Sequence, residues 1–305
     1  MIAKRHTWAA VLLSLLTPGL GHLYAGSAPA ALLFGILTGP IAVSLFLLAV
    51  FTAPSPSVFL LLALTVLSAV WAGVPIHAAR HARRAGSTYE LRSFNRWFVY
   101  VAFVLGVALW QQALFLLSKT YVAEAFRMPS ASGEPTLLVG DFFYILKFPR
   151  TARSELTDAL VVFRTPEQRG LRVVKRAVGL PGDTLRMRDG LLYRNGRPIT
   201  EPYTKRHNVP LPPEDRYVSQ MRAWQIPHVV GADPARYRPT TRDWGPLVVP
   251  PDSFFAIGDN RDESYDSRFY GFIPLATISG QPSLIYFSYQ SGVGVRWRRL
   301  GHRIS

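Results

Sequence analysis

The chain lacks cysteine altogether and is poor in acidic residues. Its 305 residues contain no Cys, and 19 Asp and Glu stand against 34 Lys and Arg, which gives a formal net charge of +15. Without cysteine the chain can form no disulfide, thiol nucleophile or thiolate metal site. No His-Glu-x-x-His motif offers a zinc site either, and we expect neither a metal nor another cofactor.

The excess of positive charge raises the question of a partner. No arginine-rich arm, aromatic RNA-binding signature or metal-finger spacing accompanies it, so we expect no nucleic acid partner. Attraction to an anionic bilayer surface explains the charge more simply. Hydrophobic residues make up 49% of the chain, which is high for a wholly soluble protein and indicates that part of it lies in lipid.

Charged residues are distributed unevenly along the chain. Residues 1–120 carry eight Lys and Arg and one acidic residue, Glu90, whereas the other 26 basic and 18 acidic residues follow. Three stretches, near 30–52, 58–76 and 97–118, are long and apolar enough to cross a hydrocarbon core of about 30 Å. We therefore predict an α-helical transmembrane region over residues 1–120, with membrane lipid as a partner.

The loop between the second and third apolar stretches decides the predicted orientation. Residues 77–96 contain five arginines near both helix ends, and the positive-inside rule puts such a loop in the cytoplasm. The third stretch then delivers the rest of the chain to the outer side. The segment 8–25 is interrupted by Pro18, Gly19 and Gly21, so we favour three spans while four spans and a cleavable targeting peptide stay open.

From residue 121 the pattern changes to short apolar runs. Runs rich in β-branched and aromatic residues, bounded by Gly, Pro, Asp and Asn, are typical of strands. We predict a mostly antiparallel all-β domain over residues 121–305, without a long amphipathic helix. Residues 205–245 are polar and rich in proline, which discourages central strands, and we interpret them as a variable insertion, forming a β-rich subdomain or long hairpin.

Two serines with a restricted backbone lie just beyond the third apolar stretch. Pro129 and Pro135 flank the sequence Ser130-Ala-Ser132, which favours a fixed turn between strands. A fixed backbone suits a nucleophile and an oxyanion hole. A serine in such a turn usually serves only the turn itself, so this segment alone does not decide between the two.

A lysine lies within an apolar strand further along the chain. In the sequence Leu171-Arg-Val-Val-Lys-Arg-Ala-Val178, a period of two puts Val173, Lys175 and Ala177 on one face. A lysine on an edge strand can extend its ammonium to water. A desolvated lysine instead has a lowered pKa and can take a proton from a serine hydroxyl at neutral pH. The strand alone leaves both interpretations open.

A third segment, residues 256–274, is rich in charge. It contains Gly-Asp-Asn-Arg-Asp-Glu-Ser-Tyr-Asp-Ser-Arg, in which Ser264, Asp266 and Arg268 alternate. In an extended chain these three side chains lie on one side and can orient a lysine through hydrogen bonds. A solvated charged turn is the alternative, and the oxygen spacing does not fit an EF-hand calcium loop.

The three segments together resemble bacterial type I signal peptidases. The resemblance covers nearly all of residues 121–290 and is carried by Gly-Asp-Asn-Arg followed by Ser-x-Asp-Ser-Arg, and by Lys-Arg-x-Val-Gly-Leu-Pro-Gly-Asp. It implies a membrane-bound serine endopeptidase that cleaves N-terminal signal peptides from exported preproteins. It also implies a place in the bacterial cytoplasmic membrane, with the catalytic domain on the extracytoplasmic side.

The same resemblance assigns roles to single residues. Ser132 matches the nucleophile and Lys175 the general base of a Ser-Lys dyad. Ser130 matches a hydroxyl of the oxyanion hole, Ser264 matches the hydroxyl that positions the lysine, and Asp266 with Arg268 matches a structural pair. The signal peptide is expected to bind as an added β-strand, and the residues expected to line its site are Phe126, Met128, Leu137 and Val174.

One position departs from the family's pattern. The family usually has methionine directly after the nucleophile, and this chain has Gly133. The missing side chain would widen the specificity pocket or loosen the turn that aims Ser132, because glycine relaxes the backbone. A catalytically silent membrane-bound homologue that only binds peptides therefore stays as the alternative function, and the oligomeric state is open.

Overall fold

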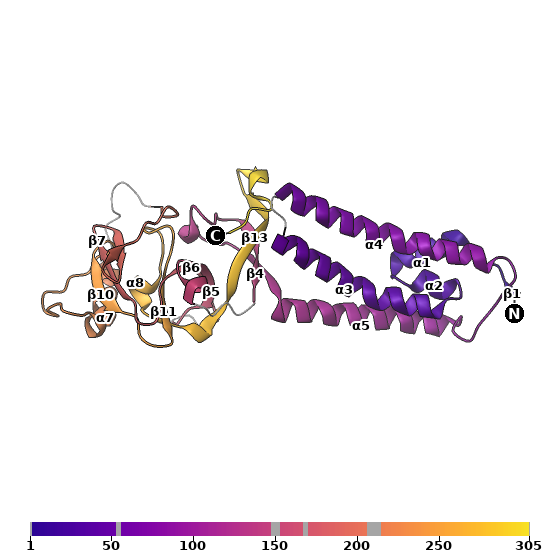
Figure 1. Cartoon of the computed structure of the whole chain (residues 1–305), viewed down its shortest axis with the longest axis horizontal. Coiled ribbons are helices and arrows are strands. Elements are labelled where there is room, and N and C mark those ends of the chain that lie inside the picture. The colour runs from indigo at the N-terminus through magenta and orange to yellow at the C-terminus, as the bar shows by residue number, and fades with distance from the viewer. Residues whose placement is uncertain (1, 53–55, 148–152, 167–169, 206–214, 305) are drawn as a thin grey trace. The chain divides into compact units, whose positions relative to one another are not determined.

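The chain folds as two compact units, Met1–Thr120 and Tyr121–Ser305. The computed structural model describes residues 2–52, 56–147, 153–166, 170–205 and 215–304 (Figure 1). Each unit has its own secondary-structure class: the first is helical and the second is built mainly from antiparallel strands.

The first unit is formed by helices of very different lengths. They are α1 (Thr7–Leu16), α2 (Leu20–Tyr24), α3 (Ala28–Thr52), α4 (Pro56–Ala85) and α5 (Trp97–Tyr121). Two short strands, β1 (Ile2–Ala3) and β2 (Tyr89–Glu90), pair antiparallel. Within the described residues, Ala28–Leu45 of α3 and the whole of α5 are long and apolar enough to cross a membrane.

These two helices coincide with the predicted stretches 30–52 and 97–118. The predicted stretch 58–76 lies within α4, and its crossing of a membrane stays a prediction. The segment 8–25 forms α1 and α2 with a break between them. Gly19 at this break has φ +91°, and a Cβ there would lie 2.2 Å from Ala31 O. At ten residues α1 falls short of the roughly 20 that a spanning helix needs.

The second unit contains two antiparallel sheets. The larger has the order β12-β11-β6-β5-β13-β4-β3, with β14 paired to β13. Its strands are β3 (Ala123–Arg127), β4 (Asp141–Leu146), β5 (Leu160–Arg164), β6 (Arg172–Gly179), β11 (Ser253–Ile257), β12 (Ile273–Pro274), β13 (Ile278–Gln290) and β14 (Gly294–Val295). The smaller has the order β10-β7-β8-β9 and consists of β7 (Thr184–Arg188), β8 (Leu191–Arg194), β9 (Arg197–Pro198) and β10 (Trp244–Val248). The predicted fold class, a helical N-terminal region followed by a mostly antiparallel β domain, is confirmed.

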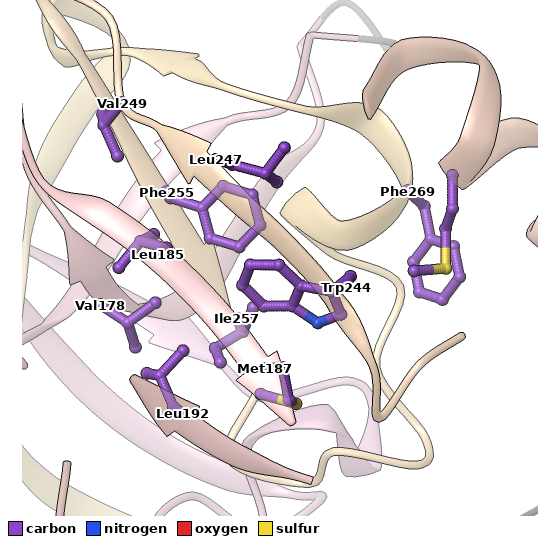
Figure 2. Close-up of a cluster of buried hydrophobic side chains, with 11 residues drawn as sticks. Val178, Leu185, Met187, Leu192, Trp244, Leu247, Val249, Phe255, Ile257 and Phe269 are labelled. Atoms are coloured by element: carbon purple, nitrogen blue, oxygen red, sulfur yellow. The ribbon is translucent and has the colours of Figure 1, made fainter. Parts of the chain in front are cut away.

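The two sheets share an apolar core that fixes the end of β11. Leu185 of β7, Leu192 of β8 and Trp244 of β10 pack with Phe255 and Ile257 of β11 in one buried cluster (Figure 2). Burying a side chain of this size stabilises the fold by roughly 1.5–3 kcal/mol. The segment that follows β11, from Gly258 on, therefore begins at a strand whose end is fixed by packing in the core.

One expectation for this unit is wrong, because an amphipathic helix lies in the predicted insertion 205–245. Helix α7 (Asp215–Gln225) begins two residues after Pro213 in the sequence and ends two residues before Pro227, so these prolines bound the helix rather than interrupt it. Met221 is fully buried in the core. The side chain of Trp224 donates a hydrogen bond to Arg268 O in the short helix α8 (Ser267–Tyr270).

Candidate active site

The serine segment forms a tight turn after β3. A short 3-10 helix, Ala131–Gly133, follows Ser130, and Ser132 is buried. The turn is held at both ends, by Met128 N–H to Asp141 O at 2.8 Å and by Leu137 N–H to Gly133 O at 2.8 Å. The hydroxyl oxygens of Ser130 and Ser132 are 3.2 Å apart, so the two predicted hydroxyls lie together on a fixed backbone.

The lysine lies inside β6, paired in register with Val161 of β5. Its side chain is only 4% exposed, and Nζ donates a hydrogen bond to Ser264 Oγ at 2.9 Å. On the other edge of β6, β11 pairs with residues from Arg176 to Gly179. The part of β6 that precedes Arg176 therefore has one edge not covered by β11.

Burial sets the protonation of Lys175. Loss of solvation lowers the pKa of Lys175 to about 8 from its ordinary value of 10.5. The carboxylate of Asp266 opposes this shift and the guanidinium of Arg268 reinforces it. A substantial fraction of the lysine is thus neutral near pH 8, as a general base requires.

Asp266 and Arg268 form a buried pair beside the lysine. Arg268 Nε donates to Asp266 Oδ1 at 2.9 Å, Arg268 Nη2 donates to Oδ2 at 3.0 Å, and Gly258 N–H also donates to Oδ2 at 3.0 Å. Burial is the largest single influence on Asp266 and would raise its pKa, but the charge and hydrogen bonds of Arg268, the charge of Lys175 and the Gly258 N–H together outweigh it and lower that pKa. The pair stays ionised and largely neutralises itself, which leaves Lys175 with a hydroxyl as its direct partner.

Glycine is required where the three segments meet. A Cβ at Gly258 would lie 2.2 Å from Ser264 Oγ and 2.7 Å from Ser132 O. Any other residue would push the nucleophile turn and the lysine's hydroxyl partner apart. Gly258 of the Gly-Asp-Asn-Arg sequence thus allows the backbone at this position to lie close to both Ser132 and Ser264.

A cavity of about 380 Å³ opens at this meeting point. It is lined by Ser130, Ser132 and Lys175, together with three of the four predicted substrate-site residues, Phe126, Met128 and Val174. Residues not predicted from the sequence also line it: Pro129, Thr165, Leu171, Arg172, Val173, Glu263, Tyr265 and Tyr270. Glu263 and Tyr265 lie on either side of Ser264 in the charged signature. Their place in the sequence could therefore have been used to predict that they line the cavity.

The fourth predicted residue, Leu137, lies elsewhere. It is fully buried in an apolar cluster with Met128 and Phe143 and does not line the cavity. Met128 also accounts for Gly133, since a Cβ at that position would lie 2.9 Å from Met128 Cε. Met128, which directly follows β3, therefore fills the space that a side chain at Gly133 would enter.

A separate histidine cluster lies in the first unit. His77 and His81 of α4 form a His-x3-His pair that the sequence shows plainly, and His77 Nδ1 is 2.8 Å from Nε2 of the buried His22. Among the described residues, no group of three or more His, Asp or Glu is arranged to hold a metal ion.

Comparisons with known proteins find relatives of this chain. Residues 95–287 match the family described as signal peptidase, peptidase S26. Signal peptidase I of Pseudomonas aeruginosa is 32% identical over 200 residues, which are 58% of this chain and 69% of that protein. Signal peptidase I of Bacillus licheniformis is 30% identical over 177 residues, 58% of this chain and 83% of that protein. The crystal structure of a signal peptidase I from Enterococcus faecalis, 30% identical, covers 42% of this chain and 95% of its own, with a TM-score of 0.27.

The family match extends over well over half of the chain and takes in all three segments that form the cavity. The relatives named above are signal peptidases I. The chain therefore belongs to the signal peptidase family, peptidase S26, and is a serine endopeptidase of that family.

Proposed function

We propose that the chain is a membrane-anchored signal peptidase that cuts preproteins with Ser132 as nucleophile and Lys175 as general base. The observation that carries the proposal is a buried lysine with a pKa near 8 that lines the same cavity as a buried serine. No histidine or metal is needed for this pairing, because a neutral amine can accept the serine proton directly.

The proposed reaction assigns one role to each of these groups. Ser132 Oγ attacks the scissile carbonyl while its proton passes to Lys175 Nζ, and the protonated lysine then gives that proton to the leaving amine. Water completes the cycle by attacking the acyl-enzyme, with Lys175 again as base. Ser264 accepts one N–H of Lys175, which limits the directions in which Nζ can point.

Two donors are available for the oxyanion. The Ser132 backbone N–H and the Ser130 hydroxyl lie on the same fixed turn, and Ser130 Oγ lies 3.2 Å from Ser132 Oγ. When a carbonyl enters the cavity, rotation about one side-chain bond turns the Ser130 hydroxyl toward it. Donors aimed at the developing charge are the largest usual contribution to such catalysis.

The substrate is expected to bind as an added strand. Residues Arg172–Lys175 of β6 pair with β5 on one side, and β11 does not cover their other side. An extended peptide placed there can pair with the backbone of β6 and reach Ser132. The apolar walls formed by Phe126, Met128 and Val174 leave little polar surface, which suits the small apolar side chains expected near the cut.

Anchoring in the membrane is supported by the continuity of the chain. Helix α5 ends at Tyr121 and β3 begins at Ala123, so a predicted spanning helix leads directly into the catalytic unit. The arginines of residues 77–96 favour a cytoplasmic loop before α5. The catalytic unit then lies on the extracytoplasmic side.

Cleavage of a preprotein tests the reaction. We expect the purified full-length protein in detergent to remove the signal peptide, and Ser132→Ala and Lys175→Ala to lose cleavage. Lys147→Ala is the matched control, since Lys147 is partly buried, forms an ion pair with Glu124 and does not itself line the cavity. Equal processing by all four proteins would refute the dyad.

A reporter enzyme tests the orientation. Fused after Ser305, a reporter that matures only outside the cytoplasm should be active. Activity of a cytoplasm-only reporter at the same position would contradict the proposed side of the membrane.

A further inference from the structure

Asn260 touches the backbone on both sides of the nucleophile. It follows β11 and is fully buried. Its backbone N–H donates to Ser132 O at 3.2 Å, and its side-chain Nδ2 donates to Ala131 O at 3.2 Å. One residue thus holds the carbonyl that precedes the Ser132 Cα and the carbonyl that follows it.

The bond to Ala131 O bears directly on the oxyanion donor. The peptide group between Ala131 and Ser132 is planar and trans, so its C=O and N–H point in opposite directions. Fixing Ala131 O therefore fixes the direction of the Ser132 N–H. A hydrogen bond accepted by the carbonyl also polarises the N–H of the same group. Glu134 N–H donates to Ala131 O as well, at 3.0 Å, so Asn260 shares this task with the turn itself.

The orientation of the amide follows from its neighbours. Nδ2 also donates to Glu263 Oε2 at 3.1 Å, and because Ala131 O and Glu263 can only accept, the NH2 side must face them. Asn260 Oδ1 is buried and has no hydrogen-bond partner within the described part of the chain. Leaving a buried acceptor unpaired is unfavourable. The useful part of this side chain is therefore its NH2 group, which donates hydrogen bonds, and not its packing.

Asp259, which precedes Asn260, binds the part of the serine segment that follows the turn at Ser132. Asp259 accepts from Thr136 Oγ1 at 2.6 Å and from Arg176 Nε at 2.9 Å. These contacts stabilise the loop but do not touch the peptide group of Ser132. The Asp259 contacts can therefore serve as a control that separates stabilisation of the segment from alignment of the Ser132 N–H.

We propose that Asn260 is a positioning residue that aims the Ser132 N–H at the oxyanion. The proposal rests on the proposed function, because it presumes that Ser132 is the nucleophile. Asn260 acts through the backbone and is not among the residues that line the cavity. Its effect therefore belongs to the transition state and not to substrate binding.

Steady-state kinetics of preprotein cleavage test the proposal. For Asn260→Ala we expect kcat to fall about 10- to 100-fold, less than the loss on removing an oxyanion donor outright, with KM within about twofold. The apparent pKa of kcat/KM should stay near 8, because Asn260 makes no hydrogen bond to Lys175. The near-isosteric Asn260→Asp, which puts a carboxylate against Ala131 O, should lose at least as much and covers the case in which Asn260→Ala fails to fold.

Thr136→Val is the matched control. It removes the hydrogen bond to Asp259 and should lower the melting temperature while kcat changes by less than about threefold. A folded Asn260→Asp with wild-type kcat would overturn the proposal, and so would a loss confined to KM or an equal loss of kcat in Thr136→Val. Failure of the proposed function is distinguishable, since it would show as no cleavage by the wild type or as cleavage that survives Ser132→Ala.

Discussion

Two neighbouring residues of β6, Lys175 and Arg176, carry buried cations on opposite faces of the strand. Arg176 donates to both oxygens of Asp259, at 2.9 and 2.8 Å, and lies 3.7 Å from the centre of the Tyr203 ring. Lys175 donates to a hydroxyl, Ser264 Oγ. The two side chains are almost equally buried, so the difference lies in the partner.

The partner decides what each cation can do. A guanidinium paired with a carboxylate stays charged and ties together the parts of the chain that carry the two groups. An ammonium that loses solvent and gains only a hydroxyl has its pKa lowered, to about 8 for Lys175. The strand thus presents a structural cation on one face and a base on the other.

Lys175→Arg should have the largest effect on activity. Arginine keeps the charge and length of the side chain but does not lose its proton in proteins. We expect the rate of preprotein cleavage to fall by at least about 10³-fold in a protein that keeps its circular dichroism spectrum. A variant that retained a tenth of wild-type activity would show that Lys175 acts by charge and not as a base.

Arg176→Met has its largest effect on stability. It leaves Asp259 buried without its ion-pair partner, which costs about 3–5 kcal/mol of the free energy of unfolding. Urea denaturation of the full chain in detergent, followed by tryptophan fluorescence, measures this. The double variant Arg176→Met with Asp259→Asn should recover much of the loss, and a single variant within about 1 kcal/mol of the wild type would contradict the structural role.

Substitutions at Gly133 and Met128 should have smaller effects. Gly133→Met should lower kcat/KM about 10-fold, because the new side chain overlaps Met128 and overpacking costs about 1–3 kcal/mol. Adding Met128→Ala should restore part of the loss, since it vacates the same space. Additive losses in the double variant would mean that the two side chains do not share the pocket wall.

Local patterns in the sequence allowed the fold class to be predicted, and the resemblance to signal peptidases allowed the meeting of the three segments to be predicted. Alternation and turn residues define β4, β6 and β11, and the signature segments bring their own anchors: Pro129 for the turn, Gly258 for the close approach, and the Asp266–Arg268 pair. The turn at Pro129 and the Asp266–Arg268 pair depend on neighbours in the sequence, whereas the close approach at Gly258 involves the distant Ser132 and is seen only in the structure.

What was missed depends on tertiary packing. Leu137 was expected in the substrate site but lies in the core, because the turn after Ser132 directs it inward. Helix α7 escaped prediction since its stability depends on burying Met221 against a distant sheet. The cavity walls from Leu171 and Tyr270 come from separate elements, and no local pattern links them.

The pH dependence of kcat/KM for preprotein cleavage tests whether Lys175 is the general base. The neutral form of Lys175 is the base, so the rate should rise with pH through an apparent pKa near 8 and level off above it. An apparent pKa near 6.5, the ordinary value for histidine, or a rate independent of pH between about 6 and 10 would contradict the assignment of Lys175 as the general base.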